Sequence, residues 1–253
     1  MNGHLAIVGL GPGDVAMLTP HAQVVLAAAS DLVGYGPYLD RVPPNPAQQR
    51  HPSDNRAEIA RAQLALALAA EGRRVAVVSG GDPGAFGMAS AVFEAIERGP
   101  AAWRALEIEV IPGISAMFAV AARLGAPLGH DFCAISLSDN LKPWPVVQRR
   151  LLAAAEAGFV IALYNPASRA RSWQLGEAFA MLRTILPPET PVVFARAVSR
   201  PDERVEMVRL DTAGAGRADM RTLVLIGSAA MRRIERPDGA PWLYAPRSVA
   251  APT

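Results

Sequence analysis

The chain has 253 residues, of which 51% are hydrophobic and 19% are charged, and its formal net charge is +2. This composition is that of a globular protein rather than a disordered one, and so small a net charge does not indicate a nucleic-acid partner. Cys133 is the only cysteine, which excludes an internal disulfide and a four-cysteine iron–sulfur cluster.

Targeting and metal signals are missing from the sequence. The N-terminus has no basic region followed by an apolar one, and no run of about eighteen apolar residues predicts a membrane span. The four histidines and one cysteine form no tight cluster, so we predict no metal site. We therefore expect a metal-free protein of the cytoplasm.

The first half of the chain alternates between short apolar runs and helical patterns. Strands are predicted at residues 4–8, 31–33, 74–79 and 107–111, and helices at residues 19–29, 53–72 and 85–97. Thr19 and Pro20 are typical of an N-cap and a first helical residue. This alternation predicts an α/β domain with a mostly parallel sheet over residues 1–113.

The pattern changes near residue 113. Helices are predicted at residues 115–124, 145–157 and 172–186, and strands at residues 132–137, 159–164, 191–197, 205–209 and 222–226. The shorter spacing of these strands predicts a second α/β domain with a mixed sheet over residues 114–236. The Pro-rich tail, residues 237–253, is expected to be loosely held.

A glycine-rich loop, Gly9-Leu10-Gly11-Pro12-Gly13-Asp14, directly follows the first predicted strand. It departs from the dinucleotide fingerprint, because Asp14 stands where a third small residue belongs and Pro12 has no N–H for a pyrophosphate. Asp31 nevertheless lies near the spacing of a ribose-binding acid. A nicotinamide-dependent oxidoreductase therefore stays open as an alternative.

Two further loops, residues 79–87 (SGGDPGAFG) and 111–116 (IPGISA), follow the third and fourth predicted strands. Ligands of open α/β sheets bind at the carboxyl ends of the strands. One such loop is explained by a tight turn alone, and Ser115 by a plain N-cap. Two glycine-rich loops that each carry an acid, Asp14 and Asp82, favour a ligand site.

These three loops, in this order and followed by Thr222-Leu223-Val224-Leu225-Ile226-Gly227, resemble the tetrapyrrole methylase family, the class III methyltransferases. The resemblance covers residues 5–227. It implies a homodimer of chains with two α/β domains, and S-adenosylmethionine bound in the cleft between the domains. That cofactor has a sulfonium and no phosphate, so backbone groups beside small residues suit it better than an anion-binding nest.

The resemblance also implies which residues meet the cofactor, and they come from all of these segments. They are Pro12, Gly80, Gly81, Asp82, Ala85, Ser115, Ala116, Asn165, Ala197, Thr222 and Leu223.

Three other segments, residues 34–38 (GYGPY), 136–144 (SLSDNLKPW) and 163–166 (LYNP), resemble the family members that methylate precorrin-3B at C-17. This implies methylation with ring contraction to precorrin-4 in cobalamin (vitamin B12) biosynthesis, a branch of porphyrin metabolism. The alternatives are a sibling precorrin or cobalt-precorrin methyltransferase that acts at another carbon, and a non-catalytic tetrapyrrole carrier on the same fold.

Ring contraction requires proton transfers, for which Asp14 and Tyr164 are the candidates, with His130 and Asp139 as further polar groups. Asp14 is equally compatible with an acid at a helix N-terminus. The carboxylates of the substrate suit the two-pronged guanidinium of arginine. The candidates are Arg41, Arg50, Arg56, Arg169 and Arg171, although each alone is compatible with a solvated surface charge.

Overall fold

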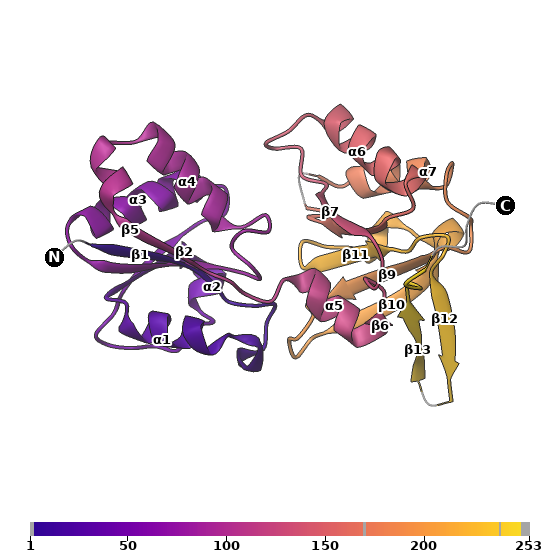
Figure 1. The fold of residues 1–253 in the computed structure, drawn as a ribbon, viewed down its shortest axis with the longest axis horizontal. Helices are drawn as coiled ribbons and strands as arrows, with labels where there is room; N and C mark the ends of the chain where they lie inside the picture. Colours follow the sequence, from indigo (N-terminus) through magenta and orange to yellow (C-terminus); the bar gives the residue numbers. More distant parts are fainter. Residues whose placement is uncertain (1–2, 169–170, 238, 249–253) are drawn as a thin grey trace. The chain divides into compact units, whose positions relative to one another are not determined.

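The computed structural model describes residues 3–168, 171–237 and 239–248. The chain forms two compact units, Met1–Ser115 and Ala116–Thr253. Each unit contains a five-stranded sheet covered by helices (Figure 1). The predicted α/β fold class is confirmed, and each unit is described by itself below.

The first unit has a sheet in which all strands run parallel, in the order β3-β2-β4-β1-β5. The strands are β1 (His4–Gly9), β2 (Asp31–Tyr35), β3 (Gln49–Ser53), β4 (Arg74–Ser79) and β5 (Glu107–Ile111). The helices are α1 (Pro20–Ala28), α2 (Gly36–Leu39), α3 (Glu58–Ala70) and α4 (Met88–Arg98). The chain leaves the neighbouring strands β1 and β4 in opposite directions across the sheet, so the topological switch point lies between them.

Both faces of this sheet are buried. Leu5 and Ile7 of β1 pack with α3 and α4, whereas Ala6 and Val8 pack with α1 on the other face. Figure 1 shows α3 and α4 on one side of the sheet and α1 on the other. Because each central strand is covered on both faces, its sequence is a continuous apolar run, which is why these strands were predictable.

Residues 36–53 differ from the prediction, which placed a proline-rich loop there and began the next helix at residue 53. They contain α2 and the edge strand β3, and α3 begins only at Glu58. The sequence of β3, QRHPS, has no apolar residue other than proline, and an edge strand tolerates Pro52. Hydrophobic periodicity therefore carries no signal for this strand.

The second unit has a mixed sheet in the order β10-β9-β11-β8-β7, in which only β7 and β8 pair in parallel. This confirms the predicted mixed sheet. The strands are β6 (Gly125–Ala126), β7 (Phe132–Ser136), β8 (Val160–Tyr164), β9 (Pro191–Arg196), β10 (Arg204–Arg209), β11 (Thr222–Ile226), β12 (Arg232–Arg236) and β13 (Gly239–Tyr244). The helices are α5 (Ala116–Leu124), α6 (Trp144–Glu156) and α7 (Gln174–Leu182). Leu151 of α6 and Phe179 of α7 belong to the core on one face of the sheet.

Part of the predicted tail is ordered by a second, smaller sheet. Residues 239–244 form β13, which pairs antiparallel with β12 and parallel with β6. Leu243 is fully buried, and the guanidinium of Arg236 lies 4.4 Å from the centre of the Trp242 ring. The prediction of a loosely held tail is wrong for this stretch, because its pairing with β12 and β6 holds it in the second sheet.

Candidate functional site

The first two glycine-rich loops are bonded to each other at the carboxyl edge of the parallel sheet. The N–H of Gly11 donates to the carbonyl of Gly81 at 3.1 Å, and the N–H of Gly81 donates to the carbonyl of Gly11 at 2.9 Å. Both residues have a positive φ, +65° and +68°. A side chain is disfavoured in this conformation, so the two glycines are required for the loops to meet.

The third loop joins this arrangement through Asp82. One carboxylate oxygen of Asp82 accepts from the N–H of Gly84 at 2.8 Å, and the other accepts from the N–H of Gly113 at 3.0 Å. A Cβ on Gly113 would lie only 2.2 Å from the carbonyl oxygen of Gly81. The three loops therefore form one backbone-lined surface next to the switch point, where the fold class favours a ligand.

Asp31 is the first residue of β2. It therefore lies at the amino ends of the parallel strands, whereas the glycine-rich loops lie at their carboxyl ends. Its carboxylate is hydrogen-bonded to His51 at 2.8 Å, to Ser30 at 2.8 Å and to Arg73 at 3.1 Å. Burial alone would raise the pKa of Asp31, but the bonds from His51, Ser30 and Arg73 outweigh it and hold the pKa below its usual range. A carboxylate at this place is remote from the loops, which removes the main support for the nicotinamide alternative.

Asp14 is exposed and is the N-cap of a short 3-10 helix, Val15–Met17. One of its carboxylate oxygens accepts from the N–H of Ala16 at 2.9 Å. Its neighbour Pro12 is buried. The interpretation of Asp14 as a helix-terminal acid is thus confirmed, and its catalytic role stays a prediction.

Two of the arginines proposed for the substrate carboxylates bind backbone carbonyls of their own unit. Arg41 donates to the carbonyls of Leu10 and Gly11 at 2.7 and 2.9 Å, and so supports the first loop. Arg50 donates to three carbonyls, at 2.9, 2.8 and 2.8 Å, between α2 and the following turn. These bonds argue for a structural role of both side chains. Arg56 is exposed, and Arg169 lies outside the described residues.

In the second unit, the predicted residues gather at one edge of the mixed sheet. Strands β8 and β9 both run antiparallel to β11, so their ends lie where β11 begins. Asn165 follows β8, Ala197 follows β9, and Thr222 begins β11. The N–H of Ala197 donates to the carbonyl of Arg221 at 2.9 Å. The structure therefore brings Asn165, Ala197, Thr222 and Leu223 together.

Backbone strain is concentrated at this edge. Asn165 and Ala197 both have a φ of +52°, in the left-handed region that costs energy for residues other than glycine. The side-chain amide of Asn165 donates to the hydroxyl of Ser136 at 2.9 Å, and the backbone carbonyl of Asn165 accepts from Arg171 at 3.1 Å. Non-glycine residues held in this conformation are most frequent at functional sites.

The hydroxyl of Thr222 is already used within the unit. It donates to the carboxylate of Asp219 at 2.8 Å and accepts from the N–H of Asp219 at 3.0 Å. Burial would raise the pKa of Asp219, but the bonds from Arg196 and Thr222 prevail and lower it. The N–H of Thr222 is bonded in the same turn, to the carbonyl of Asp219 at 3.2 Å.

Tyr164 lies at the end of β8, and its hydroxyl accepts from the N–H of Met117 at 3.1 Å. That N–H belongs to the first turn of α5, whose N–H groups have no partner within the helix. The structure therefore places Tyr164 beside the start of α5, next to Ala116. Ser115, the last residue of the first unit, is buried.

The remaining polar candidates bind neighbouring side chains. His130 lies 3.6 Å from Asp131, which is mostly exposed. Asp139 accepts from the side-chain amide of the buried Gln174 at 3.1 Å. His130 precedes β7 in the chain and Asp139 follows it, so they lie at opposite ends of this strand. Only Asp139 is on the side of Tyr164.

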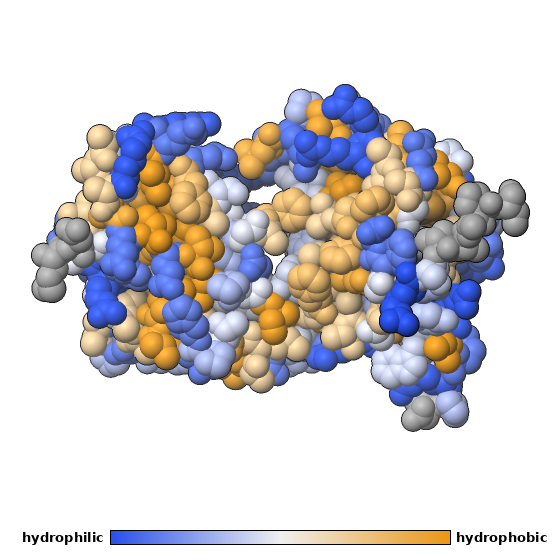
Figure 2. Space-filling view, viewed as in Figure 1, coloured by the Kyte–Doolittle hydropathy of each residue, from blue (hydrophilic) through white to orange (hydrophobic). Residues whose placement is uncertain are grey.

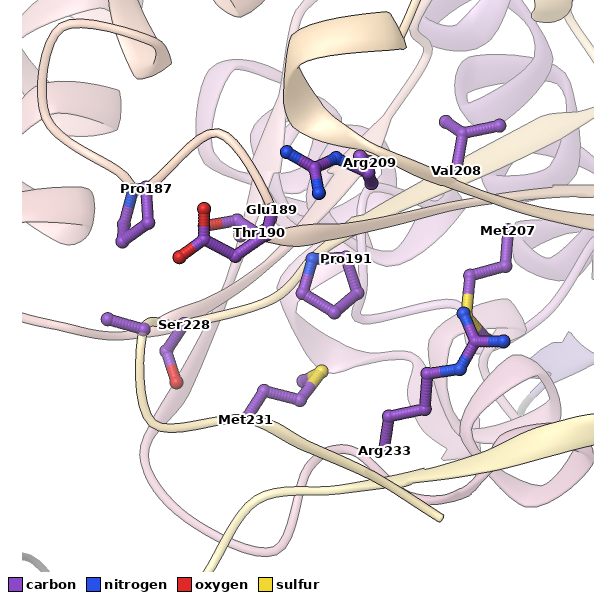
Figure 3. A pocket seen from close by; sticks show the side chains of 11 residues that line it. Pro187, Glu189, Thr190, Pro191, Met207, Val208, Arg209, Ser228, Met231 and Arg233 are labelled. Carbon is purple, nitrogen blue, oxygen red and sulfur yellow. The ribbon is translucent and has the colours of Figure 1, made fainter. Parts of the chain in front are cut away.

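A surface pocket of the second unit lies away from all of these residues (Figure 3). It is formed where β9 begins and where β10 and β11 end, the opposite edge of the sheet from Asn165 and Thr222. Its lining includes Pro187, Thr190, Met207, Arg209, Ser228 and Met231. No residue that we assign to the cofactor borders it.

The structure also bears on metal binding and on membrane spans. Over residues 3–168, 171–237 and 239–248, no three His, Cys, Asp or Glu side chains are grouped so as to hold a metal ion. In the same part of the chain, every helix is too short or too polar to cross a membrane.

Three side chains support the site in roles that were not predicted. Arg41 holds the first loop, Ser136 holds Asn165, and Asp219 holds Thr222. Arg41 and Ser136 form hydrogen bonds with residues that are distant in the sequence, and Asp219 bonds Thr222 within a turn that the sequence pattern does not predict. No pattern in the sequence identifies such partners.

Comparisons with known proteins show which family the chain is similar to. The family model of tetrapyrrole (corrin/porphyrin) methylases matches residues 4–214. A precorrin-3B C(17)-methyltransferase from Sinorhizobium sp is 60% identical over 99% of this chain and 98% of its own length. A probable cobalt-factor III C(17)-methyltransferase from Salmonella typhimurium is 41% identical over 88% of this chain and 92% of its own. A crystal structure of the methyltransferase CobJ has a TM-score of 0.92 and 50% identity, and covers 96% of this chain and 100% of that chain.

Proposed function

The chain belongs to the tetrapyrrole methylase family, and we propose that it methylates precorrin-3B at C-17. The methyl donor is S-adenosylmethionine, and the reaction includes contraction of the macrocycle in cobalamin biosynthesis. The relative that is 60% identical over nearly the full length of both chains is the observation that carries the choice of substrate.

The donor set of the site suits this cofactor. Gly80, Gly81 and Asp82 lie at the switch point, and the Asp82 carboxylate is occupied by two N–H groups. Asn165, Ala197 and Thr222 lie together at the strand ends of the second unit. Arg41 donates to the carbonyls of Leu10 and Gly11 in the first loop. A guanidinium used in this way supports the loop and does not serve as a phosphate-binding group, and S-adenosylmethionine has no phosphate.

When bound, S-adenosylmethionine supplies an electrophilic methyl group. The task of the chain is to orient the tetrapyrrole carbon in line with that group and to exclude water, an effect worth roughly 7–11 kcal/mol in well-oriented reactions. We assign the proton transfers of ring contraction to Asp14 and Tyr164. Asp14 is exposed on the first loop, and the Tyr164 hydroxyl is held by the N–H of Met117.

Radiolabel transfer tests the proposal. The purified chain is incubated without oxygen with methyl-labelled S-adenosylmethionine and either precorrin-3B or cobalt-factor III. We expect one methyl group per precorrin-3B and slower transfer to the cobalt-containing substrate. Faster transfer to cobalt-factor III would assign the chain to the activity named for the relative from Salmonella. Transfer to neither, with activity on another precorrin, would identify a sibling enzyme.

We further propose that the enzyme works in the cytoplasm as a homodimer. Large apolar side chains are exposed on the first unit, among them Val24, Phe93 and Val110, and Figure 2 shows apolar areas on this unit. Exposed areas of this kind are frequent at interfaces between protein chains. Light scattering after size-exclusion chromatography should give twice the mass of the chain, and a monomer mass would contradict this.

A further inference from the structure

Tyr38 lies in the segment 34–38 (GYGPY) and follows β2 at the carboxyl edge of the parallel sheet. Its ring packs on the core of the first unit and meets the ring of Tyr35 edge to face, with 5.4 Å between the ring centres. Arg50 donates to the carbonyl of Leu39 at 2.9 Å and so fixes α2, the short helix that carries Tyr38. The position of the Tyr38 ring is therefore set by packing on several sides.

The tip of the Tyr38 ring lies against Gly80, in the second glycine-rich loop. A Cβ on Gly80 would lie 2.7 Å from Cζ of Tyr38 and 2.9 Å from its hydroxyl oxygen. Tyr38 is only half-buried, and over residues 3–168, 171–237 and 239–248 its hydroxyl forms no hydrogen bond. Gly80 is one of the residues assigned to the cofactor, so a cofactor bound there lies next to a hydroxyl that can still donate.

A buried positive charge lies at the same edge of the sheet. Arg61 of α3 is 5% exposed, and its guanidinium donates to the Ser53 hydroxyl, the Asp54 backbone carbonyl and the Met88 sulfur, at 2.7, 2.8 and 3.2 Å. Ser53 ends β3, and Met88 begins the helix after the second glycine-rich loop. All three acceptors are uncharged, so the charge of Arg61 is not neutralised by the groups that bind it.

This charge acts at the hydroxyl of Tyr38. Burial lowers the pKa of Arg61, whereas the negative charges of Glu58 and of an ionised Tyr38 would raise it. Glu58 is exposed, so solvent screens its charge. A buried cation is costly unless a negative group lies near it. The corner between Tyr38 and Gly80 therefore suits an anionic group that accepts a hydrogen bond.

S-adenosylmethionine has three charged groups, and only the carboxylate of its amino-acid part is negative. We propose that the hydroxyl of Tyr38 donates a hydrogen bond to this carboxylate and holds the amino-acid part of the cofactor beside Gly80. This inference rests on the cofactor of the proposed function and adds a binding residue to its site. It does not depend on which tetrapyrrole receives the methyl group.

Calorimetric titration with S-adenosylmethionine and with decarboxylated S-adenosylmethionine, which lacks only the carboxylate, tests the inference. Tyr38→Phe removes the hydroxyl and keeps the ring against Gly80. We expect it to raise the Kd for S-adenosylmethionine about ten- to a hundredfold, the range for losing one hydrogen bond to a charged group. Its Kd for the decarboxylated form should stay within about threefold of the wild type. Tyr35→Phe, the same change in the neighbouring ring, is the control and should leave both Kd values within about threefold.

Three results would overturn the inference. The first is an unchanged Kd of Tyr38→Phe for S-adenosylmethionine, and a raised KM for the tetrapyrrole would then assign the hydroxyl to the substrate. The second is an equal weakening for the decarboxylated form, which would place the hydroxyl on another part of the cofactor. The third is an equal loss in Tyr35→Phe. If the wild type binds S-adenosylmethionine but methylates no precorrin, the proposed function fails, and the Kd values still decide the role of Tyr38.

Discussion

The carboxylate of Asp82 accepts a hydrogen bond from the backbone N–H of Gly113, 3.0 Å away, although the two residues are 31 positions apart in the chain. The same carboxylate accepts from Gly84 within its own loop. Asp82 thus joins the loop after β4 to the loop after β5. Its acidity therefore serves the architecture of the site.

Asp82→Ala should therefore loosen two loops at once. Loss of two bonds to a charged acceptor should lower the free energy of unfolding by about 1–3 kcal/mol and weaken the binding of S-adenosylhomocysteine. Urea unfolding and calorimetric titration measure the two effects. Asp40→Ala, which removes an exposed carboxylate at the end of α2, is the control and should change neither. Full cofactor affinity in Asp82→Ala would show that the link between the loops is dispensable.

Gly113→Ala tests the close approach of the loops. The new Cβ would lie 2.2 Å from the carbonyl oxygen of Gly81, so the backbone must move. We expect a loss of about 1–3 kcal/mol in unfolding free energy and strongly reduced cofactor binding. Gly176→Ala is the matched control, because it lies in α7 with no atom within 4 Å of the added carbon. It should stabilise the protein by up to about 1 kcal/mol. Equal behaviour of the two variants would refute the proposed packing.

Asp14 has a structural and a proposed catalytic role that two substitutions separate. Asparagine caps a helix as well as aspartate does, whereas alanine loses the bond to the N–H of Ala16. If Asp14 transfers a proton, Asp14→Asn and Asp14→Ala should both slow turnover at least tenfold, with unchanged cofactor binding. Only Asp14→Ala should lose stability, by about 0.5–1 kcal/mol. Normal turnover in Asp14→Asn would leave Asp14 with the capping role alone.

The bonds of Asp31 should make stability depend on pH. The pKa of this carboxyl is lowered in the folded state, so its contribution is present above the unfolded value, about 3.9, and is lost as the pH falls below it. Asp31→Asn should cost about 1.5–3 kcal/mol at pH 7 and less at pH 3, measured by urea unfolding. Asp54→Asn, at an exposed carboxylate, should follow the wild-type profile. A cost for Asp31→Asn that is constant with pH would contradict the assignment.

Much of the fold was predictable because burial leaves a clear pattern. The runs at residues 5–8 and 75–78 are apolar throughout, since β1 and β4 are covered on both faces. Strand β3 could not be predicted in this way, because it is polar and lies at the sheet edge. Strand β13 was missed because its place depends on pairing with β12 and β6, a contact that its own composition does not encode.

The candidate site was also predictable in part. The glycine-rich loops are local signals, and their position after parallel strands predicts that they meet. The sequence does not reveal that Arg41 would be occupied by the carbonyls of Leu10 and Gly11, or that Asp31 would be bound at the opposite sheet edge. Such pairings depend on distances that arise only when the sheet has formed.

The position of the transferred methyl group tests the central claim most directly. The chain is incubated without oxygen with precorrin-3B and S-adenosylmethionine carrying a ¹³C methyl group, and the product is examined by mass spectrometry and NMR. We predict one labelled methyl on C-17 of a contracted macrocycle, and loss of the signal when the cofactor loops are disrupted by Gly113→Ala. A label on any other carbon, or on a ring that is not contracted, would contradict the account.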